Sequence, residues 1–147
     1  MIQDVEGDAL QELLSEEYQL NLSRLPLMVT VRGFCRQRDG RTHVDSADKV
    51  VTCLLYLNSG GWAPQGGRLR LLRDGASLGE VIAEVAPDGG NFVSFLRTEN
   101  SWHGHAPYTG PRRYVMFNWM TSDSSFHRNV GRHRLSAAIK RLFGSEY

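Results

Sequence analysis

Short runs of strand-forming residues recur about every ten residues between Leu27 and Met120, and this spacing limits the fold more than any other feature. β-Branched, aromatic and leucine side chains dominate the runs, whereas Gly, Pro, Asn and Asp fill the breaks between them. No helical periodicity interrupts the series. Closely spaced short strands are typical of a sandwich or closed double sheet. The sequence therefore predicts a mainly β fold of about eight strands.

Helical patterns lie at the two ends of the chain. Asp8 can cap a first helix, and leucine, alanine and isoleucine residues repeat at helical spacing over 132–143. The chain has 147 residues, 41% of them hydrophobic, which is enough to bury one core. We therefore predict a single domain over 1–147, with a helical segment over 1–25, a β core over 27–120 and a closing helix.

The charge balance argues against a polyanionic partner. The net charge is +1, so we expect neither nucleic acid nor an anionic membrane to bind. No apolar run has the length of a membrane-spanning helix, and the N-terminal residues are acidic where a signal peptide would be basic. Two cysteines are too few for a disulfide framework, so a cytoplasmic protein is predicted. Four clustered arginines either form a solvated rim or attract an acidic partner. They are Arg32, Arg36, Arg38 and Arg41.

The tripeptide His43-Val44-Asp45 is a candidate half of a metal site. In a β-strand, His43 and Asp45 point to the same face because they are two positions apart. Such a tripeptide alone is more often a surface hydrogen-bonded pair than a metal site. A third ligand from a distant strand would complete the two-histidine, one-carboxylate arrangement of non-haem iron(II) enzymes. His103 and His105 can each supply this ligand, since they share a face in a regular strand.

The last predicted strand contains two adjacent arginines. Alternation puts Arg113 on one face with Val115 and Phe117, and Arg112 on the more polar opposite face. Burying an unpaired charge costs several kcal/mol, so an inward Arg113 requires a buried acidic side chain or a bound anion. A ligand carboxylate would fit its guanidinium fork.

The most strand-like run spans 49–57, and alternation puts Leu54 and Tyr56 on one face. If that face is interior, the Tyr56 phenol needs a partner and can donate to a carboxylate held by Arg113. An ordinary core tyrosine bonded to the backbone is the alternative. Leu54 and Leu69 can then wall the apolar middle of a ligand.

Together these features resemble the iron(II)- and 2-oxoglutarate-dependent oxygenases, and within them the prolyl-hydroxylase-like branch. The resemblance covers residues 28–119. The middle of this region is similar to the prolyl hydroxylases that act on hypoxia-inducible factors, whereas other details are more similar to small bacterial members. The resemblance rests on His43-Val44-Asp45, on Val51 to Asn58 followed by Trp62 and Gly66 to Arg70, and on His103 with Pro107 and Arg113.

The resemblance implies a double-stranded β-helix, the jelly-roll or cupin-like fold, with flanking N- and C-terminal helices. It makes His43, Asp45 and His103 the iron ligands, and its spacing favours His103 over His105. In this family an arginine pairs with the distal carboxylate of 2-oxoglutarate, and a tyrosine donates a hydrogen bond to the same group. The predicted 2-oxoglutarate pocket consists of Arg113, Tyr56, Leu54 and Leu69.

The implied activity is hydroxylation of an unactivated C–H bond with Fe(II), 2-oxoglutarate and O2, and with ascorbate as a candidate reductant. The substrate would be a prolyl residue, a proline-like amino acid or a peptide, so the partner is a small molecule, a peptide or a protein. Where the hypoxia-factor enzymes have a tyrosine near the iron, this chain has Val31 or Arg32, which puts their protein substrate in doubt. Proximity in sequence to the metal ligands predicts substrate contacts from Arg32, Trp102 and His105.

Two other functional classes remain open on the sequence. A zinc-dependent, cupin-type hydrolase can use the same three ligands, but it does not require an inward arginine and tyrosine. The second of these classes is a non-catalytic metal-binding β-barrel module.

Overall fold

The computed structural model describes residues 8–122. These residues fall into two compact units, one made of residues 8–27 and 120–122 and the other of residues 28–119. The second unit contains the β core and every residue of the candidate site.

The first unit contains the helices of the described chain. Helix α2 spans Asp8–Tyr18 and begins at the residue predicted to cap it. The short 3-10 helix η1 spans Leu22–Arg24 and is capped by Asn21, whose side-chain oxygen accepts a hydrogen bond from the Ser23 amide at 3.1 Å. Between residues 8 and 122, no helix is long and apolar enough to cross a membrane. The predicted closing helix over 132–143 lies outside the described residues.

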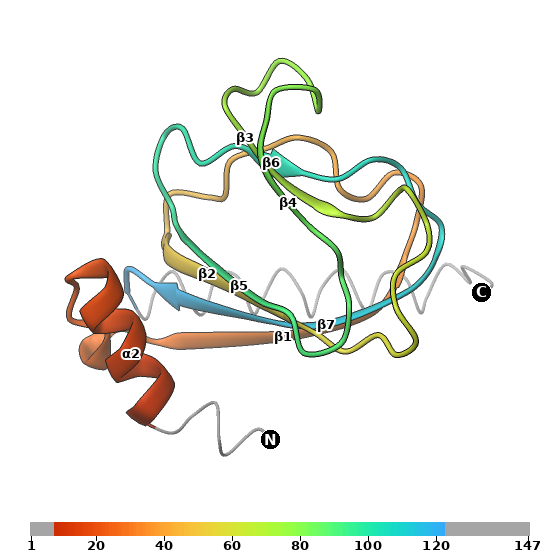
Figure 1. The fold of residues 1–147 in the computed structure, drawn as a ribbon. Coiled ribbons are helices and arrows are strands. Elements are labelled where there is room, and N and C mark those ends of the chain that lie inside the picture. The colour runs from red at the N-terminus through yellow and green to blue at the C-terminus, as the bar shows by residue number, and fades with distance from the viewer. Residues whose placement is uncertain (1–7, 123–147) are drawn as a thin grey trace, which may run out of the picture. The chain divides into compact units, whose positions relative to one another are not determined.

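Strands dominate the second unit, which confirms the prediction of a mainly β fold. The described residues contain seven strands in two sheets, with the orders β1-β7-β2-β5 and β4-β3-β6. Figure 1 shows the two sheets facing each other. The strands are β1 (Leu27–Cys35), β2 (Lys49–Tyr56), β3 (Leu69–Leu72), β4 (Val81–Val85), β5 (Phe92–Leu96), β6 (His103–Gly104) and β7 (Gly110–Met120).

Strand β2 is central in its sheet and is buried on both faces. It pairs antiparallel with β5, with Thr52 opposite Phe95 and Leu54 opposite Val93. Val51 and Cys53 are fully buried on the other face. A strand covered on both sides needs an almost continuous apolar sequence, which explains why 49–57 is so strand-like. One hydrophobic cluster contains Leu54, Tyr56, Leu69, Val93 and Phe95.

The three-stranded sheet places His103 opposite a loop residue. Leu71 of β3 pairs with His103 of β6, and His103 also forms an isolated antiparallel bridge with His43. His103 exchanges both of its backbone hydrogen bonds with His43, while on the other side the carbonyl of its neighbour Trp102 accepts from the Leu72 amide at 2.8 Å. The segment that contains His43 thus lies along the edge of this sheet beside β6.

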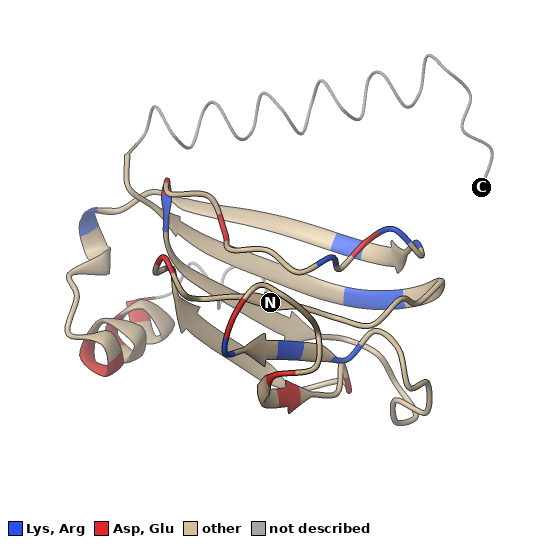
Figure 2. Ribbon diagram, turned by 90° about the horizontal axis from the view of Figure 1, so that it is seen from above, with Lys and Arg blue, Asp and Glu red and all other residues tan. Residues whose placement is uncertain are grey.

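Charged residues are interspersed over the strands and loops (Figure 2). The arginines at positions 32, 36, 38 and 41 are all exposed, and Asp39 lies in the turn among them. The Asp39 carboxylate accepts a hydrogen bond from the Arg36 amide at 2.9 Å, and Gly40 follows with a φ of 77°. Asp39 and Gly40 therefore form a turn, in one of the breaks that Gly and Asp fill. A Cβ at position 40 would meet the His105 ring at 2.2 Å, so glycine is required for this close packing as well as for the turn.

Candidate active site

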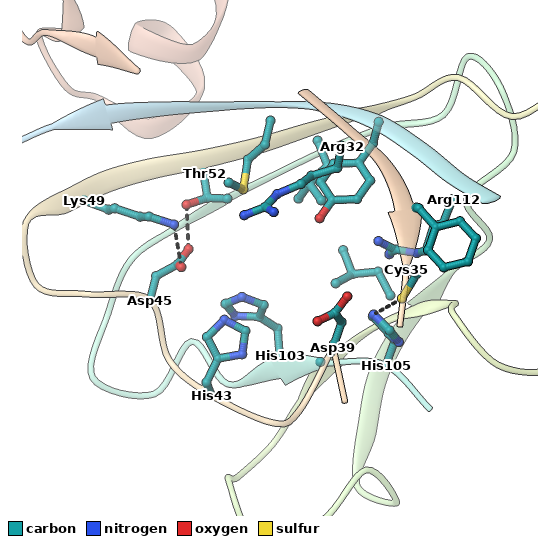
Figure 3. A pocket seen from close by; sticks show the side chains of 17 residues that line it. Arg32, Cys35, Asp39, His43, Asp45, Lys49, Thr52, His103, His105 and Arg112 are labelled. Atoms are coloured by element: carbon teal, nitrogen blue, oxygen red, sulfur yellow. Dashed lines mark hydrogen bonds and ion pairs between the residues drawn. The ribbon is translucent and has the colours of Figure 1, made fainter. Parts of the chain in front are cut away.

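A cavity of about 300 Å³ lies between the two sheets (Figure 3). Residues of β1, β2 and β7 line it from one sheet, and residues of β3 and β6 line it from the other. The segment 39–45 and His105, which follows β6, contribute the rest. A cavity of this size falls at the lower end of the range that binds small organic ligands.

Two histidines of the cavity lie side by side because their backbones are paired. The amide of each of His43 and His103 donates to the carbonyl of the other, at 3.0 Å in both directions, and their ring centroids are 4.3 Å apart. Opposite residues in such a pair project to the same side of the sheet. The His43 Nδ1 lies 2.8 Å from the Arg41 carbonyl, and the His103 Nδ1 lies 2.9 Å from the Ser101 carbonyl. Each Nδ1–H can donate to that carbonyl, which leaves both Nε2 atoms as unprotonated acceptors.

Asp45 provides an ionised carboxylate beside the histidines. Its Oδ1 lies 2.6 Å from the Lys49 ammonium, and its Oδ2 accepts from the Thr52 hydroxyl at 2.7 Å. Burial alone would raise the pKa of Asp45, but the Lys49 charge and these hydrogen bonds hold this pKa below its ordinary value. Arg97 fixes the backbone by donating to the Asp45 carbonyl at 3.2 Å. The carboxylate is therefore charged and fixed in place at neutral pH.

The three side chains form one candidate metal site. The ligand atoms of His43, Asp45 and His103 all lie within 4.8 Å of one another. Burial lowers the pKa of His103, so its ring is neutral at neutral pH, and Phe95 packs against it with ring centroids 4.8 Å apart. Two imidazoles and one carboxylate are the donor set of non-haem iron(II) oxygenases. These residues therefore fit an Fe(II) ion.

The hydroxyl of Thr52 links Asp45 to a buried asparagine. Thr52 Oγ1 lies 2.7 Å from Asp45 Oδ2 and 2.9 Å from the side-chain oxygen of Asn118. Since a hydroxyl has one proton and an ionised carboxylate can only accept, Asn118 must donate to Thr52. The Asn118 amide nitrogen is buried and lacks a partner among residues 8–122, and a half-turn of the amide brings this nitrogen to Thr52. Asn118 and Thr52 therefore form a chain of donors that ends on Asp45.

A buried arginine lies at the other end of the cavity. Arg112 is 3% exposed, and its Nε donates to the Gly67 carbonyl at 2.8 Å while its Nη2 donates to the Tyr56 hydroxyl at 3.1 Å. The rings of Tyr56 and Tyr114 lie 5.2 and 4.9 Å from the guanidinium carbon. A guanidinium has five N–H donors, so both Nη1 protons and one Nη2 proton remain for a ligand. Burial raises the pKa of Tyr56 to about 12, which keeps its phenol neutral.

Residues 32–121 match the family profile described as the 2OG-Fe(II) oxygenase superfamily. The match covers well over half of the chain and includes the whole candidate site. The chain belongs to this superfamily.

Structural comparison places this superfamily member near a prolyl hydroxylase. A prolyl-4-hydroxylase from Pseudomonas putida is 25% identical, with a TM-score of 0.56. The match covers 76% of this chain but 61% of that chain, so this chain spans less than two thirds of that enzyme's length. A pilus structure from Bacillus endospore appendages matches over 67% of this chain and 89% of that chain, at 12% identity and a TM-score of 0.35, too low to support an argument. No curated protein matches the chain. This superfamily member is thus prolyl-hydroxylase-like, and its mainly β structure is consistent with a jelly-roll fold.

The structure places the two adjacent arginines differently from the prediction. Arg113 is exposed and lies outside the cavity lining, where its backbone amide donates to the Asn58 side chain at 2.7 Å. Arg112 occupies the cavity instead. The prediction took the apolar face of this strand as the cavity face. Val115 and Phe117 are indeed buried, but they lie on the face away from the cavity, because β7 is covered on both sides.

The other predicted pocket residues lie in or near the cavity. Leu54, Leu69, Arg32 and His105 line it. Tyr56 is fully buried and is absent from the lining, and its hydroxyl contacts Arg112. Tyr56 was predicted to contact 2-oxoglutarate, but it contacts Arg112, the residue that would bind that ligand.

Two of the predicted substrate residues, Trp102 and His105, pack against other parts of the chain. Trp102 is absent from the lining because its ring packs over Gly75, where a Cβ would meet it at 2.6 Å. His105 lines the cavity, but its Nδ1 lies 2.9 Å from the Ala106 carbonyl and its Nε2 lies 3.8 Å from the Cys35 sulfur. His105 is therefore not part of the metal cluster. The prediction also missed other lining residues, among them Phe34, Cys35 and Lys49. Of these three, Lys49 had a signal in the sequence, its spacing of four from Asp45.

Proposed function

We propose that this protein is a dioxygenase that hydroxylates an unactivated C–H bond. The reaction converts 2-oxoglutarate, O2 and a C–H substrate into succinate, CO2 and a C–OH product. One oxygen atom of O2 enters the carboxylate of succinate and the other forms the new hydroxyl group. Loss of CO2 from 2-oxoglutarate supplies the two electrons that balance the reaction.

One observation carries this proposal: the metal cluster and a buried arginine with free donors line the same cavity. The cluster fits Fe(II) through His43, Asp45 and His103, and Arg112 offers three unused N–H groups to a carboxylate. A zinc hydrolase would need the first feature alone. Superfamily membership supports the same conclusion.

The residues around the cavity have distinct roles in this proposal. Bound Fe(II), chelated by the keto acid, would supply the redox chemistry that activates O2. Arg112 would hold the distal carboxylate of 2-oxoglutarate through a charge-assisted pair of hydrogen bonds. Leu54 and Leu69 would cover the methylene groups and exclude water. Lys49 would keep the neighbouring carboxylate ligand ionised.

The substrate proposed here is a prolyl residue, a proline-like amino acid or a peptide. The similarity to the Pseudomonas putida prolyl-4-hydroxylase supports this choice. The reductant in such a reaction would be ascorbate or a compound of equivalent chemistry.

The first test requires no substrate. Metal-free protein is mixed anaerobically with Fe(II) and 2-oxoglutarate, and the weak visible charge-transfer band of a chelated keto acid is recorded. We expect a band with the wild type. Succinate in place of 2-oxoglutarate should give none, because it has no keto oxygen for the metal.

The His103→Ala variant serves as the loss-of-metal control in this test. It should show no band, because only two of the three proposed ligands remain and they no longer hold the ion. Circular dichroism would show that the variant is folded. A wild type that gives no band and binds zinc tightly instead would contradict the proposal and favour the hydrolase.

A further inference from the structure

Strand β1 presents a cation and an aromatic ring to the cavity, and the proposed reaction uses neither. Arg32 and Phe34 are two positions apart, so they project from the same face of the strand. Both line the cavity, and Phe34 is 57% exposed. An exposed aromatic side chain in a cavity wall is typical of a ligand contact.

Arg32 differs from the other cations of the cavity because it has no partner. Lys49 is paired with Asp45, and Arg112 donates to Gly67 and Tyr56. Within residues 8–122, by contrast, no hydrogen bond or ion pair involves the Arg32 side chain. Figure 3 shows that this side chain points into the cavity.

Neither carboxylate of the proposed co-substrate is available to pair with Arg32. One carboxylate of 2-oxoglutarate would bind the metal and the other would bind Arg112. Asp39 also lines the cavity, but its carboxylate accepts from the Arg36 amide and forms no ion pair with Arg32. A guanidinium in this position can therefore bind one further anionic group, and its planar fork matches a carboxylate.

We propose that Arg32 and Phe34 form a substrate subsite for a small carboxylic acid with an apolar body, such as a free apolar amino acid. The guanidinium binds the carboxylate, and the Phe34 ring covers the apolar part. This inference rests on the proposed function and narrows its substrate class. A prolyl residue inside a protein lacks this carboxylate, so the subsite favours the free amino acid over the internal residue.

The test compares acids with their own amides. Succinate formation from 2-oxoglutarate is measured with Fe(II) and each standard L-amino acid, and then with the carboxamide of every amino acid that stimulates it. An apolar amino acid should stimulate turnover, and its amide should have a kcat/KM lower by about tenfold or more. Arg32→Gln should remove this difference between acid and amide. Phe34→Ala should lower kcat/KM for the acid by about tenfold.

Two controls make the outcomes distinguishable. Arg38→Gln removes an exposed arginine of the same region that is absent from the cavity lining, and it should behave as the wild type. Arg32→Gln should retain the anaerobic 2-oxoglutarate band, because Arg32 is assigned to the substrate.

Several results would overturn the inference. Equal stimulation by acid and amide in the wild type would show that the carboxylate is not recognised. Stimulation by no amino acid would show that the subsite does not bind a free amino acid. Loss of the 2-oxoglutarate band in Arg32→Gln would assign Arg32 to the co-substrate instead. Absence of that band in the wild type would overturn the proposed function and this subsite with it.

Discussion

The two ends of the cavity are built in different ways. At the metal end, His43 and His103 face each other in a backbone bridge, and Asp45 follows His43 by two positions. At the opposite end, Arg112 and Tyr56 come from two central strands and are both almost fully buried. The His43–Asp45 half of the candidate metal site can thus be recognised from a short spacing, whereas the buried arginine is defined by which face of a strand points inward.

The ends also differ in what fixes the functional groups. The two imidazoles of the candidate metal site are oriented by carbonyls two residues away in the chain. Arg112 is instead held by Gly67, which lies 45 positions away, and by Tyr56, which lies 56 positions away. The orientation of the two imidazoles should therefore depend on residues nearby in the sequence, whereas the position of Arg112 depends on packing between distant segments.

The largest effect on Fe(II) affinity is expected when His103 and its neighbour His105 are each replaced by alanine and compared. His103→Ala removes a proposed metal ligand and should weaken Fe(II) binding by more than about 100-fold. His105→Ala should leave Fe(II) affinity within about threefold of the wild type, because the His105 ring contacts Cys35 and Ala106 instead. Competition with a fluorescent chelator measures both affinities. Equal losses in the two variants would contradict the assignment of His103.

A smaller effect is expected from the donor chain behind Asp45. Thr52→Val is nearly isosteric but removes the hydroxyl that donates to the carboxylate, and it should weaken Fe(II) binding by about tenfold. Thr52→Ser should restore most of this affinity. Thr30→Val, on β1 and outside the cavity lining, is the matched control. If Thr52→Val bound Fe(II) as tightly as Thr30→Val, the hydrogen-bond donors behind Asp45 would have no influence on metal affinity.

The arginine end should show its dependence on packing in the stability of the protein. Tyr56→Phe removes the acceptor of a charged donor and should lower the free energy of unfolding by about 2 kcal/mol. Urea denaturation at pH 8 measures this loss. Wild-type stability at this pH would mean that Arg112 does not depend on the phenol.

The same variant should also change the response to alkaline pH. The Tyr56 pKa is raised from 10.0 to about 12, so the phenol contributes stability below pH 10 that is lost as pH rises toward 12. In that window the unfolded chain releases the proton and the folded chain retains it, at a cost of about 1.4 kcal/mol per pH unit. Tyr56→Phe should therefore lose less stability than the wild type between pH 10 and 12. Parallel curves from denaturation at several pH values would refute this.

The sequence was most informative where short-range chemistry determines structure. The mainly β fold, the Asp39-Gly40 turn and the start of helix α2 all follow from local composition. His43 and Asp45 were candidates because of their residue types and spacing, whereas His103 was chosen over His105 through the family resemblance. The structure brings these three side chains together.

The sequence was least informative where a strand is buried on both faces. The more apolar face of β7 suggested that Arg113 points inward, yet Arg112 does. Apolar content shows which side is packed, and here both sides are packed, so it could not show which one borders the cavity. Trp102 was misplaced for a related reason, since closeness in sequence to His103 says nothing about the side of the strand on which a ring packs.

The most direct test of this account compares the two adjacent arginines. 2-Oxoglutarate is titrated into anaerobic, Fe(II)-loaded Arg112→Gln and Arg113→Gln, and its affinity is read from the charge-transfer band. Thermal melts confirm that both variants are folded. We predict that Arg112→Gln binds 2-oxoglutarate about tenfold or more weakly, whereas Arg113→Gln stays within about twofold of the wild type. The reverse order, or equal affinities in the two variants, would contradict the assignment of Arg112 as the carboxylate anchor.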